Sequence, residues 1–336
     1  MITRRAFGGR AALPLIGAAR QAVAQEAWPT RDLLGIIQWG AGGATDVTSR
    51  AVTPHAEAAL GHKIVLQNRP GGSGAIGMTA VHTAAPDGNT LLYAAENPLL
   101  YRVLNLSRID FVPEFYAVNV LARGVPVIVT HPDRPWRTLK DLVEDMRRNP
   151  GRIKMAGTGP GGQPHVISSM LGSLGDIRHI SVPFEGEGPG LTALQGGHVD
   201  FMPAGSGATA EHVRAGRLRA ISVFNPDPLP SFPGVQPCTA DYPELARFLP
   251  WGSFYGVWVR RDVPADRRDK LVAAFKQGAA NPQFVQLMEG NGNVVMNISG
   301  DEADRFLKRW QSVTTWTLQE AGAAKTSPAE LGIPRP

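Results

Sequence analysis

The sequence predicts an α/β protein of two lobes, each built on a mostly parallel sheet flanked by helices. Short apolar segments alternate with helical segments in both halves of the chain, and glycine-rich loops separate them. This alternation is typical of βα units, whose ligands gather at the loops beyond the carboxyl ends of the strands. With 336 residues the chain is long enough for two lobes with separate cores, since domains commonly hold about 100–200 residues.

The first βα unit begins at residue 33. Residues 33–39 are mainly apolar and are followed by Gly-Ala-Gly-Gly-Ala-Thr-Asp at 40–46, which predicts a buried strand, a glycine-rich loop and the start of a helix. Pro54 falls inside that helix and is expected to kink or split it. The pattern then repeats as a strand, a glycine-rich loop, a helix and a further strand at 63–66, 68–74, 75–84 and 91–95.

The second half of the chain repeats the arrangement. A strand at 153–156, a loop at 157–163 and a helix opened by Pro164 predict another βα unit, and further units follow at 188–202 and 209–224. Residues 225–253 are rich in proline and are expected to return the chain to the first lobe. We therefore assign lobe one to residues 25–124 with 255–336, and lobe two to residues 125–254.

The first 24 residues are typical of an export signal. Arg4 and Arg5 precede an apolar stretch at 11–19, and residues 22–24, Ala-Val-Ala, form a cleavage site of small residues. The arginine pair and the weakly apolar core favour the twin-arginine route over general secretion. We expect cleavage near Ala24 and a periplasmic mature protein.

The composition excludes several classes of partner. Without the four arginines among residues 1–24, the 34 Lys and Arg side chains fall to 30, against 29 acidic ones, so the net charge gives no support for a nucleic-acid partner. No later run reaches the ~18 apolar residues of a membrane helix. Cys238 is the only cysteine, and the eight histidines show no paired metal spacing. We expect no cofactor, no metal and a monomer.

Four glycine-rich loops are the strongest functional signal. They cover residues 40–46, 70–74, 157–163 and 184–188, and each lies at a helix start or a tight turn. Backbone N–H groups at such positions can point into a shared space, where the helix dipole favours an anion without any lysine or arginine. The loops therefore predict a site for a carboxylate or a phosphate.

Enzyme motifs are missing from the sequence. There is no phosphate loop of the Walker type and no dinucleotide-binding glycine spacing. Ser73 and Ser206 lie beside glycines but outside any Gly-x-Ser-x-Gly elbow. His165 and Asp46, both at helix starts, are better explained by local structural roles than by ligand contact. We expect a binding protein with no catalytic residues.

These loops resemble those of the periplasmic receptors of tripartite tricarboxylate transporters, the Bug family. The family pattern Pro-Phe-x-Pro-Gly-Gly-x-Thr-Asp is similar to residues 38–46, with departures at Gln38, Trp39 and Ala41. The resemblance runs through nearly all of the mature chain. It also covers Gln-Asn-Arg-Pro-Gly-Gly-Ser-Gly at 67–74, Ala-Pro-Asp-Gly-Asn-Thr-Leu at 85–91, the loop and histidine at 157–165, Val-Pro-Phe-Glu-Gly at 182–186 and Gly-Gly-His-Val-Asp at 196–200.

The resemblance implies a Venus-flytrap protein of the type II periplasmic-binding class. It captures a small organic carboxylate between its lobes and delivers it to the membrane permease subunits of a tripartite tricarboxylate transporter. By position, the resemblance places the ligand against Trp39, Gly42, Gly43, Thr45, Asp46, Gly72, Ser73, Thr158, Gly159, Gly161, Gly162, His165, Phe184 and Gly186.

The sequence leaves the ligand and the role partly open. Trp39 and Phe184 could stack on a flat ring from opposite sides, which favours an aromatic carboxylate or a dicarboxylate. Glu185 stands where the family often has lysine, which disfavours citrate if this side chain faces the cleft. The alternative role is a sensor whose closed form docks on a receptor kinase, and a periplasmic enzyme is a more distant third.

Overall fold

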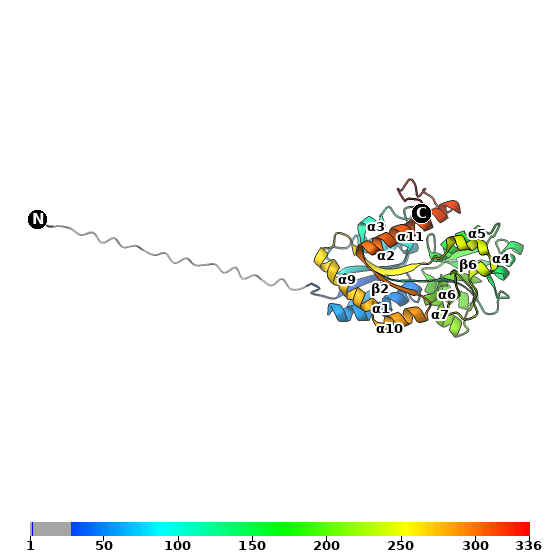
Figure 1. Ribbon diagram of the computed structural model, residues 1–336, viewed down its shortest axis with the longest axis horizontal. Helices are drawn as coiled ribbons and strands as arrows, with labels where there is room; N and C mark the ends of the chain where they lie inside the picture. Colours follow the sequence, from blue (N-terminus) through cyan, green and yellow to red (C-terminus); the bar gives the residue numbers. More distant parts are fainter. Residues whose placement is uncertain (1, 3–27) are drawn as a thin grey trace.

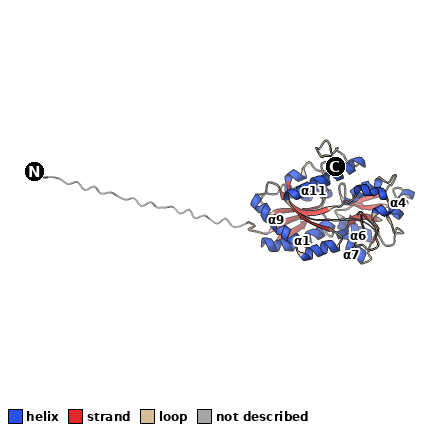
Figure 2. Cartoon of the chain, in the orientation of Figure 1, coloured by secondary structure: helices blue, strands red, loops and turns tan. Residues whose placement is uncertain are grey.

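The computed structural model describes residues 2 and 28–336, in which helices cover both faces of two sheets (Figures 1 and 2). The strands of lobe one are β1 (Leu33–Ile37), β2 (Ile64–Asn68), β3 (Thr90–Ala94), β4 (Phe115–Arg123), β10 (Phe254–Arg260) and β11 (Val294–Ile298). The strands of lobe two are β5 (Pro126–Thr130), β6 (Lys154–Gly157), β7 (Ile180–Pro183), β8 (Phe201–Gly205) and β9 (Arg219–Val223). The two-lobed α/β prediction is confirmed.

Both sheets are mixed, and most of the strands in each run in one direction, as expected. Their strand orders are β11-β4-β10-β3-β1-β2 and β7-β6-β8-β5-β9. Strand β10 runs antiparallel to β3 and β4, and β5 runs antiparallel to β8 and β9. The reason lies in the crossings between the lobes. Strands β5 and β10 each begin where the chain has just crossed, so they run away from the other lobe, whereas β1, β3, β6 and β8 run toward it.

The helices form layers above and below the sheets. Lobe one carries α1 (Ala44–Leu60), α2 (Ala75–His82), α3 (Phe111–Glu114), α9 (Ala265–Ala279), α10 (Pro282–Gly290) and α11 (Gly300–Glu320). Lobe two carries α4 (Leu139–Arg148), α5 (Gln163–Gly172), α6 (Glu187–Gln195) and α7 (Ser206–Arg214), and α8 (Cys238–Asp241) lies in the return crossing. Helices α1 and α9 cover one face of the six-stranded sheet, and α2 and α11 cover the other (Figure 1).

Helix α1 continues through Pro54, so the expected split does not occur. Proline lacks the N–H that would bond to the carbonyl of Arg50, four residues earlier. Arg50 and Pro54 are both exposed, so water can reach the carbonyl that loses its partner. On the buried side, the hydroxyl groups of Ser49 and Thr53 donate to the carbonyls four residues before them, at 2.6 and 2.7 Å.

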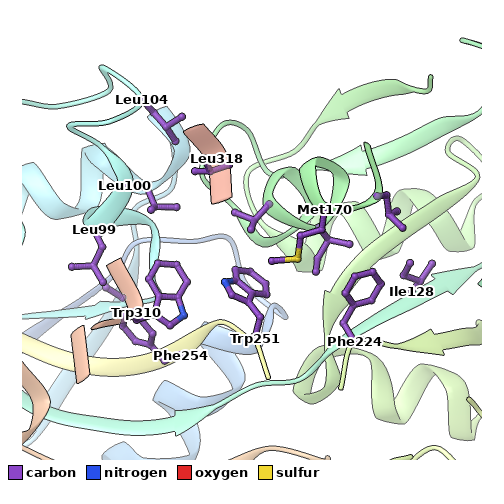
Figure 3. Close-up of a cluster of buried hydrophobic side chains, with 14 of the residues drawn as sticks. Leu99, Leu100, Leu104, Ile128, Met170, Phe224, Trp251, Phe254, Trp310 and Leu318 are labelled. Atoms are coloured by element: carbon purple, nitrogen blue, oxygen red, sulfur yellow. The ribbon is translucent and has the colours of Figure 1, made fainter. Parts of the chain in front are cut away.

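The two lobes do not have separate cores, contrary to the expectation from chain length. The buried apolar side chains form two clusters, one on each face of the sheets, and each cluster includes residues of both lobes. Figure 3 shows part of the first cluster, in which Trp251 lies between Trp310 of α11 and Met170 of α5. On the other face, Val52 of α1 belongs to the same cluster as Met202 of β8.

The chain passes between the lobes at two adjacent places. Strand β4 leads through Gly124 and Val125 into β5, and residues 224–253 bring the chain back to β10. The two crossings are joined by a hydrogen bond in which the Gly124 N–H donates to the Ser253 carbonyl, at 2.8 Å. The boundaries of the two lobes remain those predicted from the sequence, and we keep them as a proposal.

Two expectations concern features outside the sheets. The predicted signal segment, residues 1–24, lies outside the described residues apart from residue 2. Among residues 28–336, none of the helices combines the length and the apolar character that crossing a membrane requires.

Candidate functional site

A small cavity lies between the lobes, at the carboxyl ends of β1, β3 and β6. Its volume is about 30 Å³, which is room for about two water molecules. The loops of both lobes and the return crossing contribute to its wall. The lining residues are Trp39, Gly43, Ala44, Thr45, Ala95, Glu96, Asn97, Thr158, Gly162, Gln163, Pro164, Glu187, Ser253 and Tyr255.

The glycine-rich loops of the two lobes touch beside this cavity. The Gly40 N–H of lobe one donates to the Glu185 carbonyl of lobe two, at 2.7 Å. The backbones approach so closely that a Cβ atom on Gly188 would lie 1.9 Å from the Ala41 carbonyl oxygen. The lobes are therefore closed on each other, and a solute larger than a few water molecules enters only when they move apart.

The N-terminus of α1 forms the lobe-one side of the site. Gly42 has a φ of 80°, a backbone conformation that residues other than glycine rarely adopt. Its N–H donates to Asp46 Oδ2 at 3.0 Å. Asp46 also accepts hydrogen bonds from Arg50 Nε and Asn68 Nδ2, both at 2.9 Å. Burial by itself would raise the pKa of Asp46, but these hydrogen bonds outweigh it and hold the pKa below its usual value. Asp46 thus holds the loop before α1 in place through its hydrogen bonds and does not line the cavity.

The N-terminus of α5 forms the lobe-two side. Thr158 and Gly162 line the cavity, and the Gly161 N–H donates to His165 Nδ1 at 3.0 Å. Burial lowers the pKa of His165, and the positive charge of Lys325 lowers it further, so the ring is neutral near pH 7 and accepts this hydrogen bond. His165 closes its own loop in the same way that Asp46 closes the loop before α1.

The second glycine-rich loop of lobe one meets lobe two at one point. Ser73 has a φ of 55° within the 3₁₀ turn Gly72–Gly74, and the Tyr101 hydroxyl donates to its carbonyl at 2.8 Å. Gly159 has a φ of 84°, which favours glycine, and a Cβ atom on it would lie 2.3 Å from Ser73 Oγ, so the two loops approach each other closely here. Ser73 and Gly159 lie at the contact between the lobes and do not line the cavity.

The structure brings together only part of the residue set expected from the sequence. Of the fourteen residues, Trp39, Gly43, Thr45, Thr158 and Gly162 line the cavity. The rest shape the loops or join the lobes. Half-buried Phe184 is not among the described lining residues, and its ring clamp with Trp39 stays a prediction. Glu185 is exposed, and its backbone carbonyl, not its side chain, joins the lobes.

Glu187, two residues further on, is a site residue that the sequence reasoning missed. Its carboxylate takes hydrogen bonds from both lobes, since the Ala44 N–H of α1 donates to Oε2 at 3.1 Å and the Gly205 N–H donates to Oε1 at 2.8 Å. Burial raises the pKa of Glu187, and the two N–H groups act in the opposite direction. A side-chain carboxylate thus lies at a helix N-terminus that was expected to hold a ligand anion.

Glu96 and Asn97, which directly follow β3, were also missed. Both are buried, with 2% and 1% of their surface exposed, and both line the cavity. Burial raises the pKa of Glu96 to about 8. Among the described residues, neither Glu96 Oε2 nor the side-chain amide of Asn97 has a hydrogen-bond partner. Their position just beyond the carboxyl end of a parallel strand is the sequence signal that could have identified them.

The cavity wall has the chemistry of a polar binding site. Within the described part of the chain, no three His, Cys, Asp or Glu side chains gather closely enough to hold a metal ion. The cavity wall offers backbone N–H groups, amides, hydroxyls and two carboxyl groups. Such a set can hold a small polar molecule by hydrogen bonds.

Two α/β lobes that close over a small polar cavity define the class of periplasmic binding proteins. The model of the tripartite tricarboxylate transporter family receptors matches residues 48–319. The chain belongs to this family, whose members are periplasmic binding proteins and not enzymes.

Named relatives agree with this assignment. Protein BugT of Bordetella pertussis is 30% identical over 236 residues, which is 68% of this chain and 71% of BugT. The solved structure of the periplasmic binding protein BugD superposes with a TM-score of 0.81 at 26% identity and covers 89% of this chain and all of BugD. MatC from Rhodopseudomonas palustris, solved with bound malate, shares the fold with a TM-score of 0.78 at 22% identity, over 85% of this chain and all of MatC.

Proposed function

We propose that this chain is an exported periplasmic receptor that captures a small organic carboxylate between its lobes and presents it to the membrane subunits of a tripartite tricarboxylate transporter. One observation carries the proposal. The cavity between the lobes is lined by the N-terminal residues of α1 and α5, one helix from each lobe. Helix N-termini favour anions, and a solute bridging two of them is held only when the lobes are closed.

The family supports the carboxylate and the transporter, because its members are receptors of such transporters and MatC was solved with malate. An aromatic carboxylate remains part of the proposal through Trp39, which lines the cavity with 7% of its surface exposed. The mechanism is capture and closure. The open lobes bind the solute, closure surrounds it, and the closed form is the one that the permease recognises.

The first test is a thermal-shift screen of residues 25–336 against aromatic and aliphatic carboxylates and their amides. A solute at 100 times its dissociation constant should stabilise the folded protein by about 2.7 kcal/mol. We expect at least one carboxylate to raise the unfolding midpoint while its amide does not. If a folded sample responds to no carboxylate in the panel, the proposed function is wrong.

A further inference from the structure

The carboxylate of Glu187 is held in position within lobe two. Glu187 is the first residue of α6, and its Oε1 atom accepts a hydrogen bond from the Gly205 N–H at 2.8 Å. Gly205 directly precedes α7 in the same lobe. The side-chain amide of Gln163, at the start of α5, also donates to Oε1, at 3.5 Å. Both contacts lie inside lobe two, so an opening movement of the lobes does not break them.

The other carboxylate oxygen makes the contact between the lobes. Glu187 Oε2 accepts a hydrogen bond from the Ala44 N–H at 3.1 Å, and Ala44 is the first residue of α1 in lobe one. The residue before it is Gly43, which has no side chain that could cap the helix. The free N–H groups and the dipole of a helix N-terminus favour a carboxylate. Helix α1 of lobe one therefore receives a side-chain cap from lobe two.

The glycines on both sides let the Glu187 side chain fit between the lobes. A Cβ atom on Gly43 of lobe one would lie 3.4 Å from Glu187 Cβ, and a Cβ atom on Gly205 would lie 3.5 Å from Glu187 Oε2. The side chain of Glu187 thus lies close against the backbones of both lobes, and its contact with lobe one exists only while the lobes are together.

Gln163 connects Glu187 to the crossings between the lobes. Its side-chain oxygen accepts a hydrogen bond from Ser253 Oγ at 2.8 Å, and only 3% of the surface of Gln163 is exposed. The Ser253 carbonyl accepts from the Gly124 N–H of the other crossing. Since the lobes are joined at these crossings, the carboxylate of Glu187 is tied to the place about which the lobes turn. Each closing movement therefore brings it to the same end of α1.

We propose that Glu187 is a latch that holds the lobes of the solute-free receptor closed, by capping α1 of lobe one from lobe two. In the open form both Oε2 and the Ala44 N–H face water, and closure replaces these water contacts with one charge-assisted hydrogen bond. A bond of this kind changes an equilibrium by about tenfold to a hundredfold. A solute then shifts an equilibrium in which the closed form is already populated. The inference concerns the receptor without solute and does not depend on the class of solute.

The test measures the distance between the lobes in solute-free protein. Residues 25–336 are purified in denaturant and refolded, which removes any bound solute. Spin labels are attached through Ala59→Cys on α1 and Arg148→Cys on α4, two exposed positions in different lobes. Cys238, the only native cysteine, is fully buried and takes no label. Double electron–electron resonance gives the populations of closed and open lobes, and we expect the closed form to be the major one in the wild-type background.

Glu187→Gln keeps the size of the side chain and removes one acceptor. A carboxyl group has two acceptor oxygens whether it is charged or neutral, whereas an amide has one, so in the closed form either the Ala44 or the Gly205 N–H faces an NH₂ group. The ratio of closed to open lobes should fall at least about tenfold, with little change in the thermal unfolding midpoint. Glu185→Gln is the matched control, because this exposed side chain makes no contact across the lobes and its loss should leave the ratio unchanged.

Glu187→Asp covers the case in which the amide disturbs folding. Aspartate keeps the charge but is one methylene shorter, so it does not reach the Gly205 and Ala44 N–H groups at the same time. This variant should open the lobes as well. Closed lobes in a folded Glu187→Asp protein would show that the bridging reach of the carboxylate is not needed.

Three further results would overturn the latch. They are a wild-type protein that is mostly open without solute, a Glu187→Gln protein as closed as wild type, and a Glu185→Gln protein that opens as much as Glu187→Gln. A lower unfolding midpoint with unchanged lobe distances would also reject it, since Glu187 would then only stabilise the fold. None of these results bears on the carboxylate receptor, which depends on solute binding in the thermal-shift screen.

Discussion

Asp46 fixes the loop before α1 through a single carboxylate. It accepts hydrogen bonds from the Gly42 N–H, from Arg50 and from Asn68, and 4% of its surface is exposed. Asn68 also donates to the Trp39 carbonyl at 2.8 Å, so the loop, β2 and α1 are held together at one point. A residue that looked from the sequence like a helix-dipole partner thus also sets the position of Trp39 in the cavity.

Asp46→Asn should lower the free energy of unfolding by about 1–3 kcal/mol at pH 7, because the charged acceptor of three hydrogen bonds is lost. The pKa of Asp46 is lowered in the folded protein, so its contribution is present above the unfolded pKa and disappears as the pH falls through the folded one. The difference between wild type and variant should therefore shrink below about pH 4.

Urea denaturation at pH 7 and at pH 3.5 measures this difference. Asp301→Asn is the control, since Asp301 is an exposed first-turn aspartate of α11 and tests the helix dipole alone. A difference for Asp46→Asn that stays constant with pH, or that equals the control, would show that the hydrogen-bonded carboxylate is not the cause.

At the scale of elements, the start of α6 decides how closely the lobes meet. Gly188 is the second residue of α6, and its backbone lies against Ala41 of the first loop. No side chain fits between the two segments. The side-chain carboxylate of Glu187, one residue earlier, accepts hydrogen bonds from backbone N–H groups of both lobes. The first turn of α6 therefore supplies both a close backbone contact and a carboxylate that bridges the lobes.

Gly188→Ala should hold the lobes apart, because the added Cβ would lie 1.9 Å from the Ala41 carbonyl oxygen. Small-angle scattering should show a larger radius of gyration than for wild type, and solute affinity should fall about tenfold or more as the closed form becomes rarer. Gly172→Ala, at the end of α5, is the matched control, since no described atom lies within 4 Å of its added Cβ. Unchanged scattering for Gly188→Ala would contradict this account.

The sequence was informative wherever a local rule decides the structure. Glycines, turns and apolar runs predicted the loops before α1 and α5, and these loops do border the cavity. Side-chain direction was beyond such rules. The sequence pattern singles out Glu185 and not Glu187, because the residue at which α6 begins decides which of the two side chains points inward. Ser253 reaches the site at the end of the return crossing, whose path no periodic pattern indicates, and this path also sets the place of Tyr255 in β10.

At the scale of the molecule, the lobes share their apolar layers. Trp251, in the return crossing, is 3% exposed and packs with its ring centroid 5.8 Å from that of Trp310. Its indole N–H donates to Thr314 Oγ1 at 3.1 Å. Since both clusters extend through both lobes, losing one lobe would expose apolar surface of the other.

Differential scanning calorimetry should therefore show one unfolding transition for the wild-type protein. Trp251→Ala should lower the free energy of unfolding by about 3–5 kcal/mol, as for other large buried aromatics. Trp316→Ala removes a half-buried indole from α11 and should cost less. Two separate transitions in the wild type would show that the lobes unfold independently despite the shared layers.

The position of β10 has a consequence for the order in which the chain can assemble. This strand lies between β3 and β4 in the sheet of lobe one, yet it follows all five strands of lobe two in the sequence. As the polypeptide grows from its N-terminus, lobe two has all its strands once residue 223 is made, while β3 and β4 still lack the strand that joins them. Lobe one is therefore the first lobe to begin and the last to be completed. Until residue 260 is made, the edges of β3 and β4 that pair with β10 have no partner strand.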